Sequence, residues 1–380
     1  MKIIHSMKNK IAFNAPINGL SFGNVSYNLL REMWKRKMDV SFFPIGQNLQ
    51  FDSFDKIDKE FVAWFKESLN GRLKTVTANT PTLKLWHLSG AHERITRDQY
   101  LLTFYELDQP TREEISMINL QEKVFVSSAY TRDLLKLSGV DESKVVHVPL
   151  GFDEDFEVIE MPRLGNTINF SLMGKWEKRK HTAKIISLWA KKFGNNPKYQ
   201  LHCLVTNPFL AQNPQQLPQV MNQVIGQALE GKRYSNINFL PKLETNTHLN
   251  RFMNGMDIDL TGLSGAEGWN LPAFNSAALG KWSVVLNATS HKDWATPENS
   301  VIVEPNGKTT AIDGIFFQPN QPFNQGNIFT WDDEEALFAM EKAVQLVEDG
   351  TKNEAGLDLQ NQFTYSKTLD KILENINERC

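Results

Sequence analysis

The sequence predicts an α/β protein made of two doubly wound, Rossmann-like parallel sheets that face each other across a cleft. The chain has 380 residues, more than one hydrophobic core usually serves, so two domains are expected. Its 41% hydrophobic and 22% charged residues are typical of a globular protein. Short apolar segments alternate with amphipathic ones. This order produces parallel strands joined by right-handed helical crossovers.

The first series of elements is predicted to form a domain of residues 1–160. Residues 10–15 (KIAFNA) have the pattern of a buried strand, and a glycine-containing loop and a helix are expected at residues 16–23 and 24–37. A second helix is expected at residues 128–137, capped by Ser128. The other strands are expected at residues 39–44, 83–88, 100–105, 123–127 and 144–148.

An acidic, poorly periodic stretch after residue 148 indicates the domain boundary, and Asp153 and Asp155 are expected to be solvated there. The second domain is predicted at residues 161–360, and residues 361–380 close the chain with an amphipathic helix. Its strands are expected at residues 167–173, 199–205, 237–240, 258–263 and 282–286. Its helices are expected at residues 182–193, 220–228, 247–254, 272–279 and 334–347.

Charge and cysteine content limit the partners and the compartment. The net charge of −3 does not favour duplex DNA as a partner, although a local basic groove is compatible with it. The two cysteines, Cys203 and Cys380, give neither a disulfide framework nor a metal-binding spacing. The start of the chain does not resemble a signal peptide, and no apolar run approaches the roughly 20 residues of a membrane span. We expect a cytoplasmic protein, free or peripheral at a membrane surface.

Three segments that follow predicted strands can carry chemistry. In residues 18–23, glycines such as Gly19 let backbone N–H groups approach an anion, although a tight structural turn has the same composition. Residues 174–180 (GKWEKRK) supply the cations that a diphosphate leaving group needs, or else form a solvated basic turn. Residues 264–272 (SGAEGWNLP) place a carboxylate between glycines before a helix, either to bind sugar hydroxyls or to cap the helix.

Together, these segments resemble the retaining GT-B glycosyltransferases of the GT4 group over most of the chain. Residues 267–280 (EGWNLPAFNSAALG) are similar to the family pattern E-G-F-G-L-P-x-x-E-A-x-x-x-G. Residues 170–193 resemble its strand, basic loop and helix, and residues 124–153 resemble its interdomain bridge. The tail QFTYSKTLDKIL also resembles that of the family.

The resemblance implies a GT-B fold with an N-terminal acceptor domain and a C-terminal donor domain. The last helix would cross back to the N-terminal domain. It implies transfer of a hexosyl group from a UDP-type or GDP-type nucleotide sugar, with retention of configuration and without another cofactor. The acceptor stays open: a glycan, a lipid-linked sugar or a modified base.

The resemblance also implies roles for single residues. Lys175 and Lys180 would clamp the donor diphosphate, and Glu267 would contact the donor sugar. The family's histidine near the reacting carbon corresponds to His92, a catalytic candidate, or to His87. Further donor contacts would come from the glycine loops, the border of the base and the turn after Glu267: Gly19, Gly174, Pro241, Lys242, Leu243, Gly268, Trp269, Asn270 and Leu271.

The acceptor side has two weaker candidates: His87, and Glu106, which follows a strand that faces the cleft. In one position the sequence departs from the family, because Asn275 stands where the second glutamate would hold the ribose hydroxyls. An amide can still accept and donate hydrogen bonds, but without charge. Trp269 and Asn270, in place of Phe-Gly, are expected to reshape the sugar pocket.

Metal binding and two alternative functions have weaker support in the sequence. Asp257-x-Asp259 resembles a metal-binding D-x-D motif, but its place at the start of a strand favours a structural role, so no essential metal is expected. Lysine-rich residues 8–10 and 35–37 could line a DNA groove in a glucosyltransferase that acts on modified bases. Asn275 is compatible with a non-catalytic subunit that binds sugar nucleotides.

Overall fold

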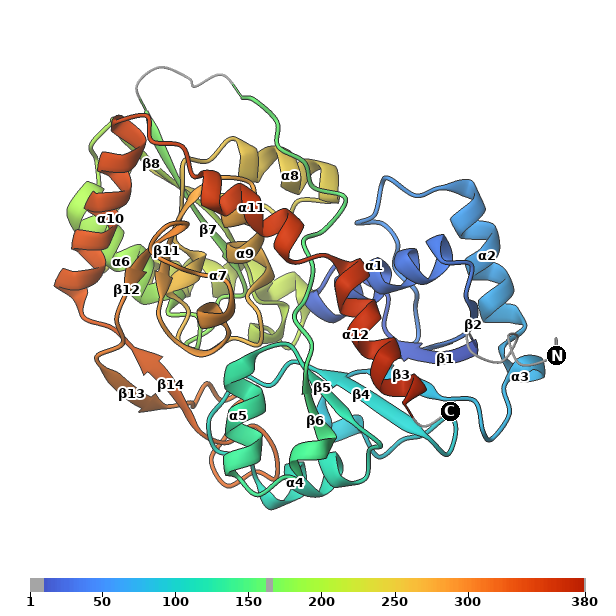
Figure 1. Ribbon diagram of the computed structural model, residues 1–380. Helices are drawn as coiled ribbons and strands as arrows, with labels where there is room; N and C mark the ends of the chain where they lie inside the picture. Colours follow the sequence, from blue (N-terminus) through green and yellow to red (C-terminus); the bar gives the residue numbers. More distant parts are fainter. Residues whose placement is uncertain (1–9, 162–166, 379–380) are drawn as a thin grey trace.

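The computed structural model describes residues 10–161 and 167–378, which form two α/β halves side by side (Figure 1). Each half contains a sheet of six parallel strands, which confirms the predicted class. The strands of the N-terminal sheet are β1 (Lys10–Ala15), β2 (Asp39–Pro44), β3 (Thr82–Leu85), β4 (Gln99–Thr103), β5 (Val124–Val126) and β6 (Val145–His147). Its helices are α1 (Ser21–Lys35), α2 (Lys59–Asn70), α3 (Arg72–Thr75), α4 (Arg112–Asn119) and α5 (Ala129–Leu137).

The C-terminal half repeats this plan and adds an antiparallel hairpin. Its sheet consists of β7 (Ile168–Gly174), β8 (Tyr199–Val205), β9 (Ile237–Phe239), β10 (Ile258–Asp259), β11 (Trp282–Leu286) and β12 (Ser300–Val303). Its helices are α6 (Thr182–Phe193), α7 (Leu217–Ala228), α8 (Asn246–Asn254), α9 (Leu271–Ala278) and α10 (Asp333–Glu348). The hairpin strands are β13 (Gly307–Thr310) and β14 (Asn327–Thr330).

Strand order fixes where each sheet can bind a ligand. The N-terminal order is β2-β1-β3-β4-β5-β6, so the direction of winding changes between β1 and β3. The C-terminal order is β12-β11-β10-β7-β8-β9, so it changes between β7 and β10. In such sheets the crevice beyond the carboxyl ends of the strands at this point is the usual ligand site.

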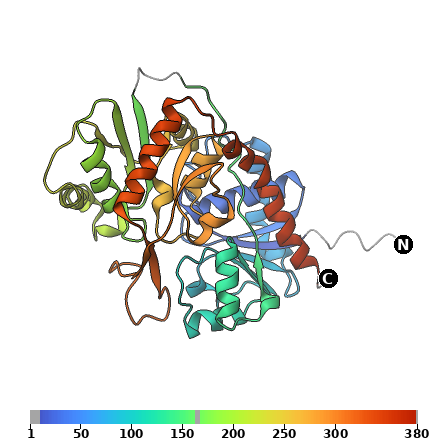
Figure 2. The same cartoon turned by 60° about the vertical axis from the view of Figure 1, so that its left-hand side comes forward.

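The end of the chain ties the two halves together. After α10, helix α11 (Glu354–Gln362) lies against α9, and α12 (Tyr365–Asn377) crosses to pack on α1 of the N-terminal half (Figure 2). Arg36 donates to Asp370 at 2.5 Å and to the Ser366 carbonyl at 2.9 Å. The predicted crossing of the last helix is therefore confirmed. The predicted boundary at residue 160 falls in the connection between β6 and β7.

The prediction that Asp153 and Asp155 are solvated is wrong. They are only 2% and 1% exposed, because Arg31 of α1 lies between this connection and the core. Arg31 Nη1 is 2.5 Å from Asp155 Oδ1, and Arg31 Nη2 is 3.6 Å from Asp153 Oδ1. Burial, with the neighbouring Asp155 charge, raises the pKa of Asp153 to about 6. A buried ion-pair cluster thus fixes the interdomain connection to α1.

Two element boundaries differ from prediction for local reasons. Helix α1 begins at Ser21, inside the predicted loop, because Gly23 lets the helix pack directly on the backbone of Asn18. The predicted strand 258–263 stops at Asp259, whose carboxylate accepts a hydrogen bond from the Thr261 backbone N–H at 3.1 Å and turns the chain. Helices α2, α3, α4 and α11 and strands β12, β13 and β14 were not predicted.

No helix within residues 10–161 and 167–378 has the length and apolar character needed to cross a membrane.

Removal of the Arg31 side chain should destabilise the fold strongly, because it leaves two buried carboxylates without a counter-charge. We expect Arg31→Met to lower the free energy of unfolding by about 3–5 kcal/mol. Arg36→Ala, which removes an ion pair between more exposed groups, should cost about 1 kcal/mol or less. Urea denaturation at pH 7 measures both, and equal effects of the two variants would contradict the assignment.

Candidate active site

A cavity of about 250 Å³ lies where the carboxyl ends of the two sheets face each other. Its N-terminal wall contains residues 19–21 of the loop after β1, together with Ser53. Its C-terminal wall comes from the ends of β7, β8 and β9 and from the start of α9. Most of the lining is apolar, including Met173, Leu204, Leu240, Leu249 and Met253. The cavity occupies the place that strand order indicates for a ligand.

Six of the predicted donor contacts line this cavity: Gly19, Gly174, Lys242, Leu243, Leu271 and Asn275. Pro241, Gly268, Trp269 and Asn270 are not among its lining residues. Asn275 is 6% exposed, and its Oδ1 has no hydrogen-bond partner among the described residues. A buried acceptor without a donor is costly. The Asn275 amide is therefore suited to bind a donor group of a ligand.

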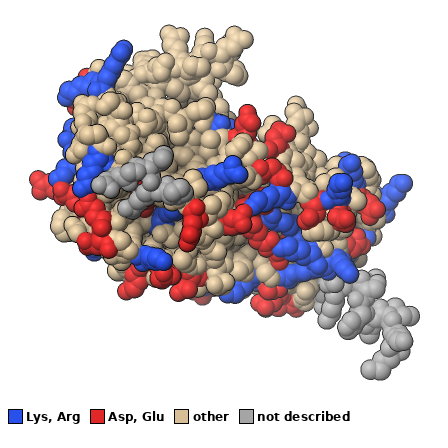
Figure 3. Space-filling view, turned by 90° about the horizontal axis from the view of Figure 1, so that it is seen from above, with Lys and Arg blue, Asp and Glu red and all other residues tan. Residues whose placement is uncertain are grey.

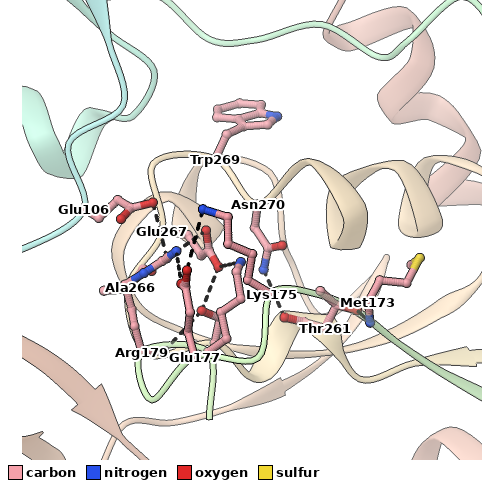
Figure 4. Close-up of polar contacts among 12 residues, drawn as sticks. Glu106, Met173, Lys175, Glu177, Arg179, Thr261, Ala266, Glu267, Trp269 and Asn270 are labelled. Carbon is pink, nitrogen blue, oxygen red and sulfur yellow. Dashed lines mark hydrogen bonds and ion pairs between the residues drawn. The ribbon is translucent and has the colours of Figure 1, made fainter. Parts of the chain in front are cut away.

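Three predicted catalytic residues, Lys175, Lys180 and Glu267, lie beside the cavity in a charged cluster. Figure 4 shows Lys175 and Glu267 within it. Lys180 Nζ donates to Glu267 Oε1, and Ser264 Oγ donates to the same oxygen at 2.7 Å. Lys175 Nζ lies 3.6 Å from Glu177 Oε1. Lys180 and Arg179 hold the pKa of Glu267 well below its usual range, against the effect of burial. Glu267 is therefore ionised across the physiological range.

Arg179 is the centre of this cluster. Its guanidinium lies 3.1 Å from Glu267, 3.0 Å from Glu177 and 3.3 Å from Glu106. It also donates to the Ala266 carbonyl. Glu106 belongs to the N-terminal half, whereas the other residues belong to the C-terminal half. The Arg179–Glu106 pair therefore spans the cleft and fixes the two halves relative to each other at the site.

Glu106 is the carboxylate of this cluster whose pKa is raised. Its surroundings desolvate the carboxylate, and the Glu267 and Glu177 charges oppose its ionisation. The Arg179 charge acts in the opposite direction. The net effect raises the pKa of Glu106 to about 7. With 27% of its side chain exposed, Glu106 can exchange a proton with solvent or with a ligand near neutral pH.

The glycines around Glu267 allow close packing. A Cβ on Gly265 would lie 2.4 Å from the Phe329 carbonyl oxygen of β14. A Cβ on Gly268 would lie 2.7 Å from Phe104 Cβ of the N-terminal half. Gly174 has φ +116° at the end of β7, where Lys180 lies alongside it. The turn is therefore confined between β14 and the opposite half.

Trp269 does not reshape the sugar pocket through its side chain. The indole is 2% exposed and packs against Phe274 and Phe363, with ring centroids 5.4 Å apart in both pairs. It points away from the charged cluster (Figure 4). Asn270 has φ +65° and donates to the Thr261 carbonyl at 3.0 Å. Both side chains therefore support the turn. The Trp269 carbonyl accepts from Trp294 Nε1 at 3.2 Å, and the Asn270 carbonyl accepts from the Phe274 backbone N–H at 3.0 Å.

The two candidate histidines lie in different surroundings. His87 packs on Phe22, with ring centroids 4.4 Å apart. The residue as a whole is exposed. Desolvation by the surrounding protein atoms, together with the nearby Lys175 ammonium, lowers the pKa of His87 to about 4. His92 is exposed, and no contact in the described part of the chain joins it to the cluster. His87, not His92, is placed at the cleft.

Asp259 of the D-x-D segment lies inside the C-terminal half and is bound by neighbouring side chains. Asp259 is completely buried and accepts hydrogen bonds from Ser171 at 3.1 Å and Thr261 at 2.7 Å. Burial raises the pKa of Asp259 to about 7. Across residues 10–161 and 167–378, no group of three or more His, Cys, Asp or Glu side chains is arranged to hold a metal ion.

Sequence reasoning missed Arg179 and Glu177 as members of the site. Both lie in the basic run 174–180, but a run of charges does not reveal which side chain is buried. Arg179 is 6% exposed, whereas Lys178 next to it is exposed. Two further residues were likewise not identified. Ser264 Oγ donates to the Glu267 carboxylate, and Thr289 Oγ1 accepts from the Glu267 backbone N–H.

Neither a family model nor a curated protein sequence matches the chain. Solved structures match it in fold at low identity. Sucrose-phosphate synthase from Thermosynechococcus elongatus gives a TM-score of 0.66 at 11% identity, over 98% of this chain and 100% of that one. HepE from Anabaena in complex with UDP gives a TM-score of 0.62 at 11% identity, over 97% of this chain and 100% of that one.

A third structure of this kind is a UDP-forming α,α-trehalose-phosphate synthase from Burkholderia xenovorans. It gives a TM-score of 0.63 at 11% identity, over 98% of this chain and 99% of that one. The match extends over both halves in each case. The chain therefore has the predicted GT-B fold.

Neutralising Glu177 should lower the pKa of Glu106, because one of the charges that oppose its ionisation is removed. Carboxyl ¹³C NMR of glutamate-labelled protein should show one resonance that titrates near pH 7 and is absent from Glu106→Gln. In Glu177→Gln this resonance should titrate at lower pH. Glu298→Gln, an exposed control, should leave it unchanged. An unshifted titration in Glu177→Gln would contradict the coupling.

Proposed function

We propose that the protein is a glycosyltransferase that moves a sugar from a UDP-type or GDP-type nucleotide sugar to an acceptor hydroxyl, with retention of configuration. One observation carries this proposal. The cavity at the carboxyl ends of both sheets adjoins the cluster in which Lys180 and Glu267 bind each other. HepE, which shares the fold, binds UDP in one structure and UDP with glucose in another. This favours UDP as the nucleotide.

The base and ribose of the donor fit the cavity. Its apolar wall, with Leu240 and Leu243, can cover a base, and the Asn275 Oδ1 can accept a hydrogen bond from a ribose hydroxyl. A neutral amide gives about half the strength of a charge-assisted bond. We therefore propose that Asn275 replaces the family's second glutamate as a weaker ribose contact.

The diphosphate would lie between Gly174 and the N-terminus of α9. Gly174 lacks a side chain there, and the first N–H groups of α9 have no helical partner. Lys180 lies against Gly174 and can move from Glu267 to the phosphate as negative charge develops on the leaving group. Lys175, which directly follows Gly174, would add a second cation.

Glu267 and the turn after it would bind the donor sugar. When Lys180 moves to the diphosphate, a Glu267 oxygen becomes free to accept a hydrogen bond from a sugar hydroxyl. Arg179 and Ser264 hold the carboxylate in place meanwhile. The Arg179–Glu106 pair keeps the halves together and limits water at the reacting carbon. Glu106 and His87 would face the acceptor.

Charge placement does not favour the alternative in which duplex DNA is the acceptor. Lys10 lies 3.7 Å from Asp39, Lys35 2.9 Å from Glu32 and Arg36 2.5 Å from Asp370, whereas Lys8 lies outside the described residues. On one face of the molecule, cations alternate with acids and form no continuous basic stripe (Figure 3). We also propose that the enzyme is cytoplasmic and acts without a metal ion.

Substitution of the diphosphate clamp or of the sugar contact should abolish turnover without unfolding the protein. We expect Lys180→Ala and Glu267→Gln each to lower kcat at least about 100-fold, since each removes a charged group from the transition state. Lys178→Ala, an exposed neighbour, should retain near-normal activity. Circular dichroism should be unchanged. Near-normal turnover in both site variants would end the proposal, and donor binding without transfer in the wild type would favour a non-catalytic subunit.

Transfer should proceed without a divalent cation, because lysine charges take the role of the metal at the diphosphate. The rate of sugar transfer in excess EDTA should equal the rate in buffer alone. A complete loss of activity that manganese restores would show that this part of the proposal is wrong.

A further inference from the structure

Four aromatic rings of the N-terminal half form a contiguous group at the edge of the cleft, here called the aromatic platform: Phe22, Trp86, His87 and Phe104. Phe22 lies in the first turn of α1, Trp86 and His87 follow β3, and Phe104 follows β4. The Phe22 ring lies 4.4 Å from those of His87 and Phe104 and 5.7 Å from that of Trp86. These positions all lie at the carboxyl ends of strands, where ligands bind in such sheets.

The platform directly adjoins the proposed donor-sugar site. Phe104 packs so closely on Gly268 that a Cβ there would lie 2.7 Å from Phe104 Cβ. Ser127 Oγ donates to the Gly268 carbonyl at 2.6 Å and holds this contact. Lys175 is close enough to His87 to affect its protonation. A molecule on the platform would therefore lie next to the turn that follows Glu267.

The platform is less buried than the aromatic core behind it. Phe13 and Phe42 in the sheet have no exposed surface, whereas Phe22, Trp86 and Phe104 are half-buried and His87 is exposed. A group of partly accessible rings next to a polar cluster indicates a ligand surface. Their faces carry negative quadrupole charge, which attracts the weakly positive C–H groups on one face of a pyranose ring.

The polar groups beside the platform suit a polyhydroxyl ligand better than a nucleic acid. Glu106, two residues after Phe104, can accept a hydrogen bond, Lys175 can donate one, and the His87 imidazole can donate or accept at the rim. Arg179 is engaged by three carboxylates, so its charge is largely balanced. Nucleic-acid bases also stack on rings, but their phosphates require several unpaired cations nearby.

We propose that the aromatic platform is the acceptor subsite and that the acceptor is a carbohydrate, with the C–H face of one pyranose ring on Trp86 and Phe22. This inference rests on the proposed function. In the reaction, the acceptor hydroxyl oxygen forms a bond to the anomeric carbon of the donor sugar. The bond from that carbon to the diphosphate oxygen breaks, and its electron pair and the hydroxyl proton leave with the nucleoside diphosphate.

Saturation-transfer difference NMR of the full chain with UDP tests this, with methyl β-D-glucopyranoside, cellotriose and maltotriose as probes. At least one probe should receive saturation mainly at the protons of one ring face. Trp86→Ala and Phe22→Leu should each reduce the signal at least about five-fold, while UDP affinity, measured by calorimetry, stays unchanged. Phe338→Ala, which removes a 68% exposed ring from α10, should leave both measurements unchanged.

Equal signals in the wild type and in both platform variants would overturn the inference. So would binding of none of the three sugars, or binding only of a duplex that contains 5-hydroxymethylcytosine. A wild type that binds sugar on the platform but binds neither UDP nor GDP would sink the proposed function and leave the platform assignment standing. The two ideas can therefore fail separately.

Discussion

The geometry of the site depends on one buried cation, Arg179. Its guanidinium is 6% exposed and meets three carboxylates, of which Glu106 belongs to the opposite half. A buried charge is tolerated only when it is paired and hydrogen-bonded, so each partner restricts the positions of the others. Glu267 is held at one place, Lys180 is held on Glu267, and the protonation of Glu106 is set by the same charges.

Close packing between the halves adds a second constraint on the cleft. Gly268 contacts Phe104 directly, and the loop of the β13–β14 hairpin reaches the N-terminal half, where the Asn327 backbone N–H donates to Asp108 Oδ1 at 2.7 Å. Helix α12 ties the far side to α1. Loops alone would leave the cleft free to vary in width. Contacts at several separate places hold the sugar turn against the aromatic platform, so a donor and an acceptor would meet in one geometry.

The regular elements could be predicted from the sequence because hydrophobic periodicity reports burial directly. Helix 182–193 and strands 10–15, 39–44, 199–205 and 282–286 have the expected bounds. The cavity residue Gly174 was found because a glycine turn after a strand has a local signal, whereas Asn275 was found through the resemblance to the family pattern. The predictions that failed concern features that depend on residues distant in the sequence. The basic run does not reveal that Arg179 is the buried member, and nothing local indicates that Asp153 and Asp155 meet Arg31. Nor does a lone histidine reveal whether it faces the cleft, which is why His92 was preferred to His87.

The most direct measurement of the central claim is a crystal structure of the protein with UDP. It should place the base and ribose in the cavity beside Leu243 and Asn275, and the diphosphate against Gly174 and the start of α9. The Lys180 ammonium should have moved from Glu267 to a phosphate oxygen. UDP bound outside this cavity, or a Lys180 still paired with Glu267 while the phosphates lie elsewhere, would contradict the account.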